Sequence, residues 1–252
     1  MTAPESAPAT EAHSDRRSPA PQVGEPWRSK KHASESWPSD YLEINRAAYN
    51  ALAKEYRARR EPDRQKDIKL IQPFLRLLRK QYGNGPLRVL DLGCGNGLNL
   101  SMFADEGFEV TGIDISGHML EVARESCPSA HLIGGDFLSY PFPQTCFHGV
   151  FAKAVIHLFP KPHAIQLIDK VRYVLKPGGI FYVTTTVDDP VTVGLRKKTD
   201  YKGSVYRFRR TWTTQELTES VSHAGFAILK TSYNREVSRG KRWFNIWARN
   251  LL

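Results

Sequence analysis

The stretch that decides the fold of this chain is VLDLGCGNG, residues 89–97. Its apolar run up to Asp91 is typical of a buried parallel strand, and three glycines follow that strand at once. Glycine lets a backbone adopt positive φ and approach a ligand closely, and the start of the next helix offers unpaired N–H groups. Ligands of open α/β sheets bind at the carboxyl ends of the strands. The stretch therefore predicts a strand at 87–92, a helix near 97–106 and a small-molecule cradle between them.

The chain downstream repeats the order of strand and helix. We expect Ser116 to cap a helix that carries Met119, and a second helix to end at the KPGG turn. Right-handed crossovers between such units produce a parallel sheet that is covered on both faces. The expected strands after the first are 108–113, 130–133, 148–153, 180–187, 227–234 and 242–249, and the second helix is 164–175. The last two strands form an antiparallel hairpin, so the predicted fold is α/β: a Rossmann-like, doubly wound, seven-stranded, mostly parallel sheet with helices on both faces.

Two regions precede this pattern. Residues 1–40 are rich in Pro, Ala, Ser and Glu and have no apolar period, so we expect a disordered tail. From Tyr41 onward apolar residues recur at helical spacing and predict two helices before the GNGP break at 83–86. Pro62 is expected to follow the first helix, and Pro73 is expected to kink the second or delay its start. We assign residues 41–252 to one domain.

Composition excludes several classes of protein. The three cysteines, at positions 94, 127 and 146, are too far apart for a metal site or a disulfide framework, and we expect buried free thiols and no metal. No apolar run is long enough to span a bilayer, and the polar N-terminus is unlike a secretory signal. We therefore expect a soluble, cytoplasmic protein. The net charge of +10 is concentrated after residue 190.

The ligand of the glycine loop belongs to one of two classes. A dinucleotide site requires G-x-G-x-x-G, but this chain has Leu98 at the third glycine position. The loop, followed by VTGIDIS (110–116) and GGDFLSYPF (134–142), resembles instead the class I S-adenosylmethionine-dependent methyltransferase family. The resemblance covers residues 43–250. It implies the cofactor S-adenosyl-L-methionine and the product S-adenosyl-L-homocysteine.

The resemblance also implies roles for the matched positions. Asp114 would accept hydrogen bonds from the two ribose hydroxyls, as an acidic residue about 20 positions past the loop does in other nucleoside-binding folds. Asp136 would accept from the adenine amine. Met119 and Phe137 would enclose the adenine ring. The implied cofactor-binding residues are Tyr49, Asp91, Gly93, Cys94, Gly95, Asp114, Ile115, Met119, Gly135, Asp136, Phe137, Ala152 and Lys153.

One position departs from the family pattern. Many relatives carry an acidic residue where this chain has His148. In those relatives the carboxylate supports the fourth strand and takes no part in the chemistry. The resemblance therefore still implies the same fold.

The methyl acceptor would be selected by parts of the chain outside the sheet. These are a helical lid at 41–82 and a substrate-lid insertion at 188–212, in which we expect residues 188–205 to form a loop. A general base is needed only if the acceptor must lose a proton, and His157, after the fourth strand, is the best candidate. A structural histidine that fixes the same loop is the alternative. In VYRFRRTW (205–212), alternation places Tyr206 and Phe208 on one face and Arg207 and Arg209 on the other, in different environments. The predicted substrate-binding residues are Tyr56, His157, Tyr201, Tyr206 and Arg210.

These residues predict a methyltransferase that modifies an O, N or C atom of a small-molecule acceptor, a metabolite or natural product of acidic or aromatic character. We expect a monomer or homodimer without a membrane partner. A tRNA or other RNA methyltransferase is the second hypothesis, favoured by the basic last quarter with its interleaved aromatic residues. A protein that binds S-adenosylmethionine without catalysis is the third.

Overall fold

The computed structural model of the chain describes residues 37–58, 60–199, 205–236 and 240–252. The predicted disordered tail lies outside the described residues except for its last four positions. Within those four, Trp37 packs edge-on against His163 with 5.6 Å between the ring centroids.

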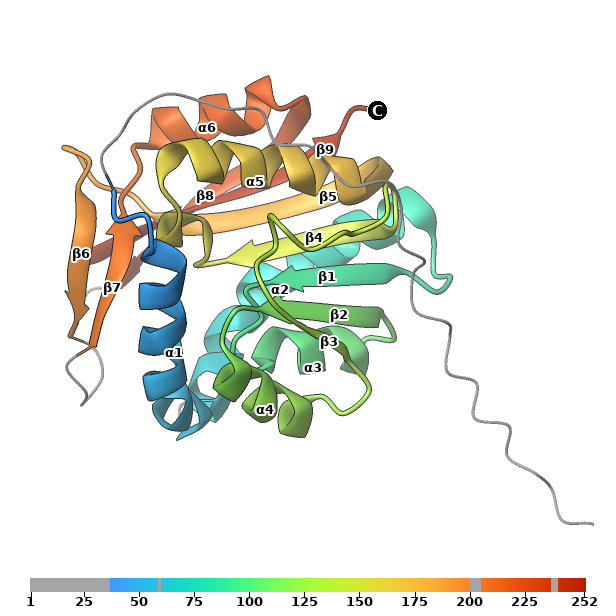
Figure 1. The fold of residues 1–252 in the computed structure, drawn as a ribbon. Coiled ribbons are helices and arrows are strands. Elements are labelled where there is room, and N and C mark those ends of the chain that lie inside the picture. Colours follow the sequence, from blue (N-terminus) through green and yellow to red (C-terminus); the bar gives the residue numbers. More distant parts are fainter. Residues whose placement is uncertain (1–36, 59, 200–204, 237–239) are drawn as a thin grey trace, which may run out of the picture.

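A seven-stranded sheet forms the centre of the molecule, in the order β3-β2-β1-β4-β5-β9-β8 (Figure 1). The strands are β1 (Arg88–Leu92), β2 (Glu109–Asp114), β3 (His131–Gly134), β4 (Phe147–Lys153), β5 (Leu175–Thr186), β8 (Phe226–Glu236) and β9 (Lys241–Asn250). Strands β1 to β5 pair in parallel, whereas β9 is antiparallel to both β5 and β8. The predicted Rossmann-like fold with a C-terminal antiparallel hairpin is confirmed.

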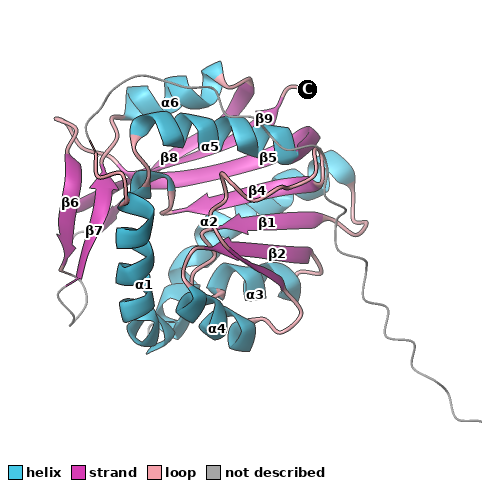
Figure 2. Cartoon of the chain, in the orientation of Figure 1, coloured by secondary structure: helices cyan, strands magenta, loops and turns pink. Residues whose placement is uncertain are grey.

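Side chains of the central strands alternate between two hydrophobic cores. Val150 of β4 packs in the core beneath α5 (Lys161–Val174) and α6 (Thr214–His223). Its neighbour Phe151 packs on the opposite face, beneath α2 (Arg60–Tyr82) and α3 (Leu98–Asp105). Helices cover both faces of the sheet (Figure 2), and the central strands β1 and β4 are accordingly mostly buried.

The two N-terminal helices differ in part from the prediction. Helix α1 (Tyr41–Ala58) is followed almost at once by α2, which begins at Arg60 and continues through Pro73. The predicted late start of the second helix is therefore wrong. Pro62 lies in the first turn of α2, where a backbone N–H would have no intrahelical acceptor.

Other local predictions can be compared with the structure. Ser116 caps α4 (Gly117–Ser126), since its hydroxyl accepts from the Met119 N–H at 3.1 Å, as predicted. Helix α5 begins at Lys161, three residues before the predicted start, and the KPGG turn lies within the bounds of β5. His148 is buried, and its Nδ1 accepts the backbone N–H of Arg88 at 2.9 Å. Burial lowers the pKa of His148 to about 4, which keeps this acceptor neutral.

The insertion between β5 and α6 is not a loop. It contains a two-stranded antiparallel sheet of β6 (Val193–Lys198) and β7 (Val205–Arg210). The predicted separation of environments in β7 is also wrong, because Arg207 and Phe208 are both buried whereas Tyr206 is 56% exposed. The physical reason is that α1 packs against β7 at both buried residues: Arg207 donates to the Tyr49 hydroxyl, and the Phe208 ring lies 5.5 Å from that of Tyr41.

The described residues contain three cysteines, all free and buried, as predicted. Among the helices that the structure describes, none has the length and apolar character required to cross a bilayer. The same part of the chain holds no group of three or more His, Cys, Asp or Glu residues arranged to bind a metal.

Candidate active site

The glycine loop after β1 is tied to the end of β2. The N–H groups of Gly93 and Cys94 donate to the Ile113 carbonyl at 2.9 and 3.1 Å. The N–H of Gly95 donates to Asp114 Oδ2 at 2.9 Å. Hydrogen bonds therefore connect the glycine loop directly to Asp114, the predicted ligand of the ribose hydroxyls.

Two of the glycines have distinct roles in this loop. Gly97 has φ +76°, and a Cβ there would lie 2.8 Å from Ala123 Cα, so only glycine lets the loop pack against α4. Gly95 has φ +53°, and a Cβ on it would meet nothing within 4 Å. Gly95 therefore exposes its backbone toward the pocket that it lines.

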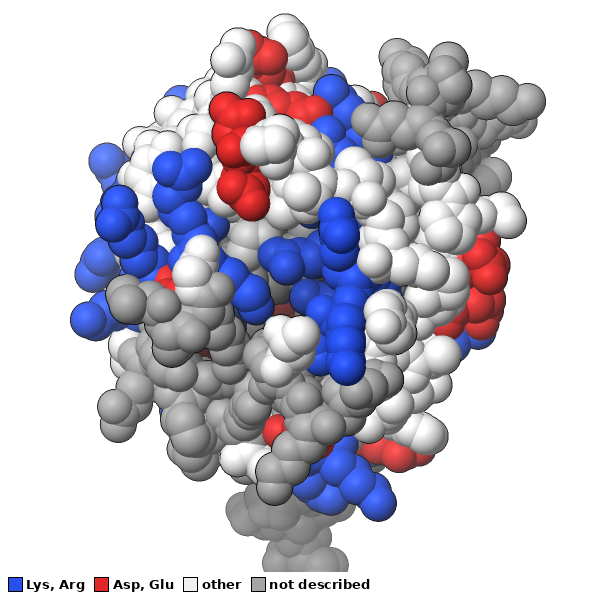
Figure 3. All heavy atoms as spheres, turned by 90° about the vertical axis from the view of Figure 1, so that its left-hand side faces the viewer, with Lys and Arg blue, Asp and Glu red and all other residues white. Residues whose placement is uncertain are grey.

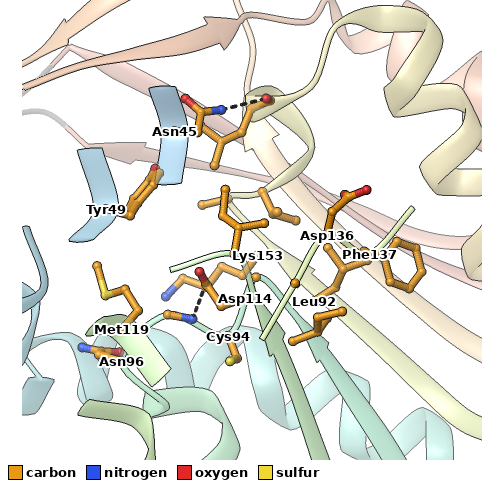
Figure 4. Close-up of a pocket in the computed structure, with 18 of the residues that line it drawn as sticks. Asn45, Tyr49, Leu92, Cys94, Asn96, Asp114, Met119, Asp136, Phe137 and Lys153 are labelled. Carbon is orange, nitrogen blue, oxygen red and sulfur yellow. Dashed lines mark hydrogen bonds between the residues drawn. The ribbon is translucent and has the colours of Figure 1, made fainter. Parts of the chain in front are cut away.

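A pocket of about 980 Å³, counted out to its open mouth, lies at the carboxyl ends of the parallel strands. Its walls come from the segments after β1, β2, β3 and β4, with α1 standing across the strand ends (Figures 1 and 4). The lining residues are Leu42, Asn45, Tyr49, Tyr56, Leu92, Gly93, Cys94, Gly95, Asn96, Asn99, Ile113, Asp114, Ile115, Met119, Gly135, Asp136, Phe137, Lys153, Ala154, Val155, Leu158 and Phe159.

Two carboxylates line this pocket. Asp114 accepts from Gly95 through Oδ2 and from the Ser116 N–H through Oδ1 at 2.8 Å. Burial raises the pKa of Asp114, although these backbone hydrogen bonds lower it. Asp136 accepts from the N–H groups of Leu138 and Ser139 at 3.2 and 3.1 Å. Each carboxylate oxygen has a second lone pair, so both residues retain capacity for a ligand.

Behind the loop lies a buried polar cluster. Neither carboxylate oxygen of Asp91 has a hydrogen-bond partner among the described residues, and the same holds for Asn99 Oδ1, which lines the pocket. Burial raises the pKa of Asp91 to about 7, while the charge of Lys153 and the neighbouring Asn99 amide act in the opposite direction. Lys153 also lines the pocket and forms an ion pair with the buried carboxylate of Asp67.

Helix α1 brings two aromatic rings and one amide to the pocket. Tyr49 and Tyr56 lie two helical turns apart with 6.1 Å between their ring centroids. Asn45 donates through Nδ2 to the Leu158 carbonyl at 3.0 Å and accepts the Phe208 N–H through Oδ1 at 2.9 Å. Asn45 was not predicted. The signal for it is a polar residue within the apolar spacing Tyr41, Asn45, Ala48, because a buried amide must find partners.

The structure brings most of the predicted cofactor residues together. All of those named above line the pocket except Asp91 and Ala152, which are buried behind its wall. The ring of Phe137 packs against Phe142 with 5.7 Å between centroids, on the core side of the loop. The predicted enclosure of adenine by Phe137 and Met119 stays a prediction.

His157 does not line the pocket. It belongs to a single 3₁₀ turn, η1 (Ile156–Leu158), in which Leu158 faces the pocket and His157 packs elsewhere. The His157 ring is 2% exposed, and its Nδ1 lies 3.1 Å from Thr185 Oγ1. Burial lowers the pKa of His157 well below its usual value, and four neighbouring cations lower it further. Its catalytic role stays a prediction.

Among the predicted substrate residues that the structure describes, Tyr56 lines the pocket, whereas Tyr206 and Arg210 of the insertion do not. Arg210 is buried, with its guanidinium 4.4 Å from the Trp212 ring and 2.6 Å from Glu216 Oε1. Burial alone would raise the pKa of Glu216, but Arg210 and Lys161 outweigh it and lower that pKa. Arg210 thus joins β7 to α6, and its substrate-binding role stays a prediction. Tyr206 of β7 is exposed, and Tyr201 lies outside the described residues.

Comparison with known proteins supports the same interpretation of the loop. A family model described as a methyltransferase domain matches residues 89–179. The chain is 40% identical over 100 residues to the putative methyltransferase YqeM of Bacillus subtilis, covering 37% of this chain and 40% of that protein. It is 31% identical over 142 residues to malonyl-[acyl-carrier protein] O-methyltransferase of Erwinia pyrifoliae, covering 56% of this chain and 50% of that protein. The chain thus spans half or less of the length of these curated relatives.

A solved structure shares most of the fold. The 1,6-didemethyltoxoflavin-N1-methyltransferase of Burkholderia thailandensis, solved with S-adenosylhomocysteine bound, superposes with a TM-score of 0.64 at 19% identity. That superposition covers 87% of this chain and 93% of the other, and at this identity it establishes the fold. The family match thus identifies a methyltransferase domain over residues 89–179, and the superposition establishes that the chain shares the fold of an S-adenosylhomocysteine-bound methyltransferase.

Proposed function

We propose that this chain is an enzyme that transfers a methyl group from S-adenosylmethionine to an O, N or C atom of a small-molecule acceptor. The observation that carries the proposal is the pocket at the ends of four successive parallel strands, with Asp114 and Asp136 in its wall. The two ribose hydroxyls and the exocyclic amine of a nucleoside are hydrogen-bond donors. Carboxylates at successive strand ends along one edge of the sheet provide matching acceptors.

The residues present fit this cofactor. Gly95 leaves backbone open to the pocket, and Asn99 Oδ1 is a buried acceptor in the pocket wall without a partner among the described residues. We infer that Asp114 binds the ribose hydroxyls and Asp136 the adenine amine. The backbone of Gly93 to Gly95 and the Asn99 amide would hold the methionine portion, while Met119 and Ile115 provide apolar contact for the adenine.

The protein's own contribution is alignment and the exclusion of water. When bound, the cofactor supplies a methyl group that its sulfonium charge already activates, so no protein nucleophile is required. Leu158 and Phe159 form an apolar wall, and Tyr49 and Tyr56 of α1 cover the open side. Such positioning lowers the barrier by fixing the acceptor atom in line with the methyl group. His157 would act only on an acceptor that must lose a proton.

A small-molecule acceptor is supported by the names of two similar proteins. The Erwinia relative is named for a malonyl group on a carrier protein, and the Burkholderia structure for 1,6-didemethyltoxoflavin. We also propose that the protein acts in the cytoplasm, because three buried free cysteines suit a reducing compartment.

Two measurements test the proposal. Calorimetry should detect binding of S-adenosylmethionine and S-adenosylhomocysteine, and methyl-labelled cofactor should transfer label to a component of the source organism's small-molecule extract. Absence of cofactor binding would contradict the proposal. Binding without any transfer favours a non-catalytic binding protein, and transfer only to purified tRNA favours an RNA methyltransferase.

A further inference from the structure

One cationic side chain reaches the wall of the cofactor pocket. Among the described residues that line the pocket, Lys153 at the end of β4 is the one Lys or Arg. The other charged residues in this lining are Asp114 and Asp136, which are carboxylates. Figure 4 shows all three among the side chains around the pocket. Lys153 therefore supplies the positive charge of this lining.

Lys153 differs from the cations on the molecular surface. Figure 3 shows many Lys and Arg side chains gathered on the face of the molecule that carries β6 and β7. Water and salt screen such charges, so they contribute little to a specific contact. The Lys153 side chain, in contrast, is only 27% exposed. Its charge therefore acts at close range within the pocket.

The buried carboxylate of Asp67 holds the Lys153 ammonium in place. Asp67 belongs to α2 and is 4% exposed, and its Oδ2 accepts a hydrogen bond from Lys153 Nζ. An ammonium has three N–H donors, and Asp67 is the hydrogen-bond partner of Lys153 within the described part of the chain. Donors therefore remain for a ligand. Because the ion pair already fixes this long side chain, a ligand that binds it has little side-chain entropy to offset.

The register of the sheet places Lys153 on the same face as Asp91. Asp91 of β1 pairs with Phe151 of β4, and alternate residues of a strand share a face, so Lys153 lies one repeat beyond Phe151 on that face. Neither carboxylate oxygen of Asp91 has a hydrogen-bond partner among the described residues, and the same holds for Asn99 Oδ1. The region thus combines acceptors, which suit an ammonium, with the Lys153 donor, which suits a carboxylate.

We propose that Lys153 binds the carboxylate of the amino-acid portion of the cofactor and makes the site selective for a cofactor that carries this group. This inference rests on the proposed function and adds a specificity-determining residue to the site. The carboxylates of Asp114 and Asp136 would repel the same group. A contact between an ammonium and a carboxylate is a charge-assisted hydrogen bond, which is stronger than a neutral one. An analogue without the carboxylate would leave Lys153 without this ligand.

Two ligands that differ only in the carboxylate test this inference without turnover. Calorimetry compares S-adenosylmethionine with its decarboxylated form, in which hydrogen replaces the carboxylate. S-adenosylmethionine should bind about tenfold or more tightly, because a site built to hydrogen-bond a group discriminates against a ligand that lacks it. Equal affinities would overturn the inference and leave the proposed cofactor standing. Failure of both compounds to bind would overturn the proposed function, and the inference with it.

A double variant assigns the selectivity to Lys153. Asp67→Asn/Lys153→Met removes both charges of the ion pair, so that no unpaired carboxylate is left buried. The affinity for S-adenosylmethionine should fall about tenfold, whereas that for the decarboxylated form should stay within about threefold, so the preference nearly disappears. Thermal melting checks that the variant is folded. A folded double variant that keeps the full preference would show that Lys153 is not the carboxylate ligand.

Two single variants are the controls. Asp67→Asn retains the Lys153 ammonium and should keep most of the preference. Arg64→Met removes a different ion pair of α2, the one with Asp105 of α3, and Arg64 does not line the pocket. It should bind both ligands as the wild type does. Loss of the preference in Arg64→Met as well would indicate an indirect effect of α2 on the pocket and contradict the assignment.

Discussion

At the residue scale, Asp114 carries the most direct test of the cofactor site. It is both an acceptor for the Gly95 N–H and a pocket residue. We expect Asp114→Ala to weaken binding of S-adenosylhomocysteine about tenfold to a hundredfold, because a charged hydrogen bond contributes on the order of 1.5–3 kcal/mol. Calorimetry measures the affinity. Glu109→Ala, at the exposed other end of β2, is the control and should bind normally. Unchanged affinity in Asp114→Ala would remove the ribose assignment.

Asp91 provides a test based on pH. Its pKa of about 7 in the folded protein is higher than the ordinary value of 3.8, so the folded state holds more protons between these two pH values. Stability therefore decreases as pH rises from about 4 to about 7, by at most about 1.4 kcal/mol for each unit of pKa difference. In the cofactor-free protein, Asp91→Asn should melt near the wild type at pH 4.5 and several degrees above it at pH 8. A difference in Tm that is the same at both pH values would show that Asp91 is ionised in the fold throughout.

At the scale of elements, Lys170 of α5 supports the loop after β3. Its buried ammonium donates to the carbonyls of Leu138 and Tyr140 at 2.7 and 2.6 Å and lies 5.3 Å from the centre of the Phe137 ring. Burial lowers the pKa of Lys170 to about 8, and Asp136 partly offsets this effect. The helix thus fixes the segment that carries Asp136.

Substitution of Lys170 should therefore affect both stability and cofactor binding. Lys170→Met removes the ammonium donor from both carbonyls, but the Tyr140 carbonyl keeps the Phe142 N–H, so the main cost is the lost Leu138 hydrogen bond, at about 1–3 kcal/mol. We expect a Tm lower by several degrees and a cofactor affinity reduced about threefold to tenfold, measured by melting and by calorimetry. Lys80→Met, on the exposed side of α2, controls for the lost charge. If Lys170→Met melts lower but binds S-adenosylhomocysteine normally, Lys170 supports the core and not the site.

At the scale of the whole molecule, the pocket joins segments that are far apart in the chain. It includes residues of α1 together with the ends of β1 to β4, and Asn45 connects α1 to both η1 and β7. A ligand in this pocket should therefore stabilise the entire fold. At a hundredfold excess over its Kd, S-adenosylhomocysteine should contribute about 2.7 kcal/mol, or roughly 5–10 °C in Tm. Thermal melting measures this shift, with adenosine monophosphate as the control ligand. A shift confined to the control would contradict the assigned cofactor.

The sequence by itself determined the sheet, the succession of its parallel strands and crossover helices along the chain, and the glycine loop. These features are local: apolar runs, helical spacing, caps such as Ser116 and glycine turns act over a few residues, and the handedness of crossovers is general. It also predicted the pocket carboxylates Asp114 and Asp136, since a residue that follows a parallel strand must lie at the same edge of the sheet.

Only the tertiary structure decided which side chains meet around that edge. Arg210 is close to Arg207 and Arg209 in sequence, yet it pairs with Glu216, whereas Arg207 donates to Tyr49 and Arg209 donates to Thr186. His157 and Leu158 are neighbours, but only Leu158 lines the pocket. Lys198 belongs to the β6–β7 hairpin and Lys241 to the β8–β9 hairpin, yet both lower the pKa of His157. Such convergence depends on how α1, η1 and two hairpins pack together, and no local period in the chain encodes those long-range contacts.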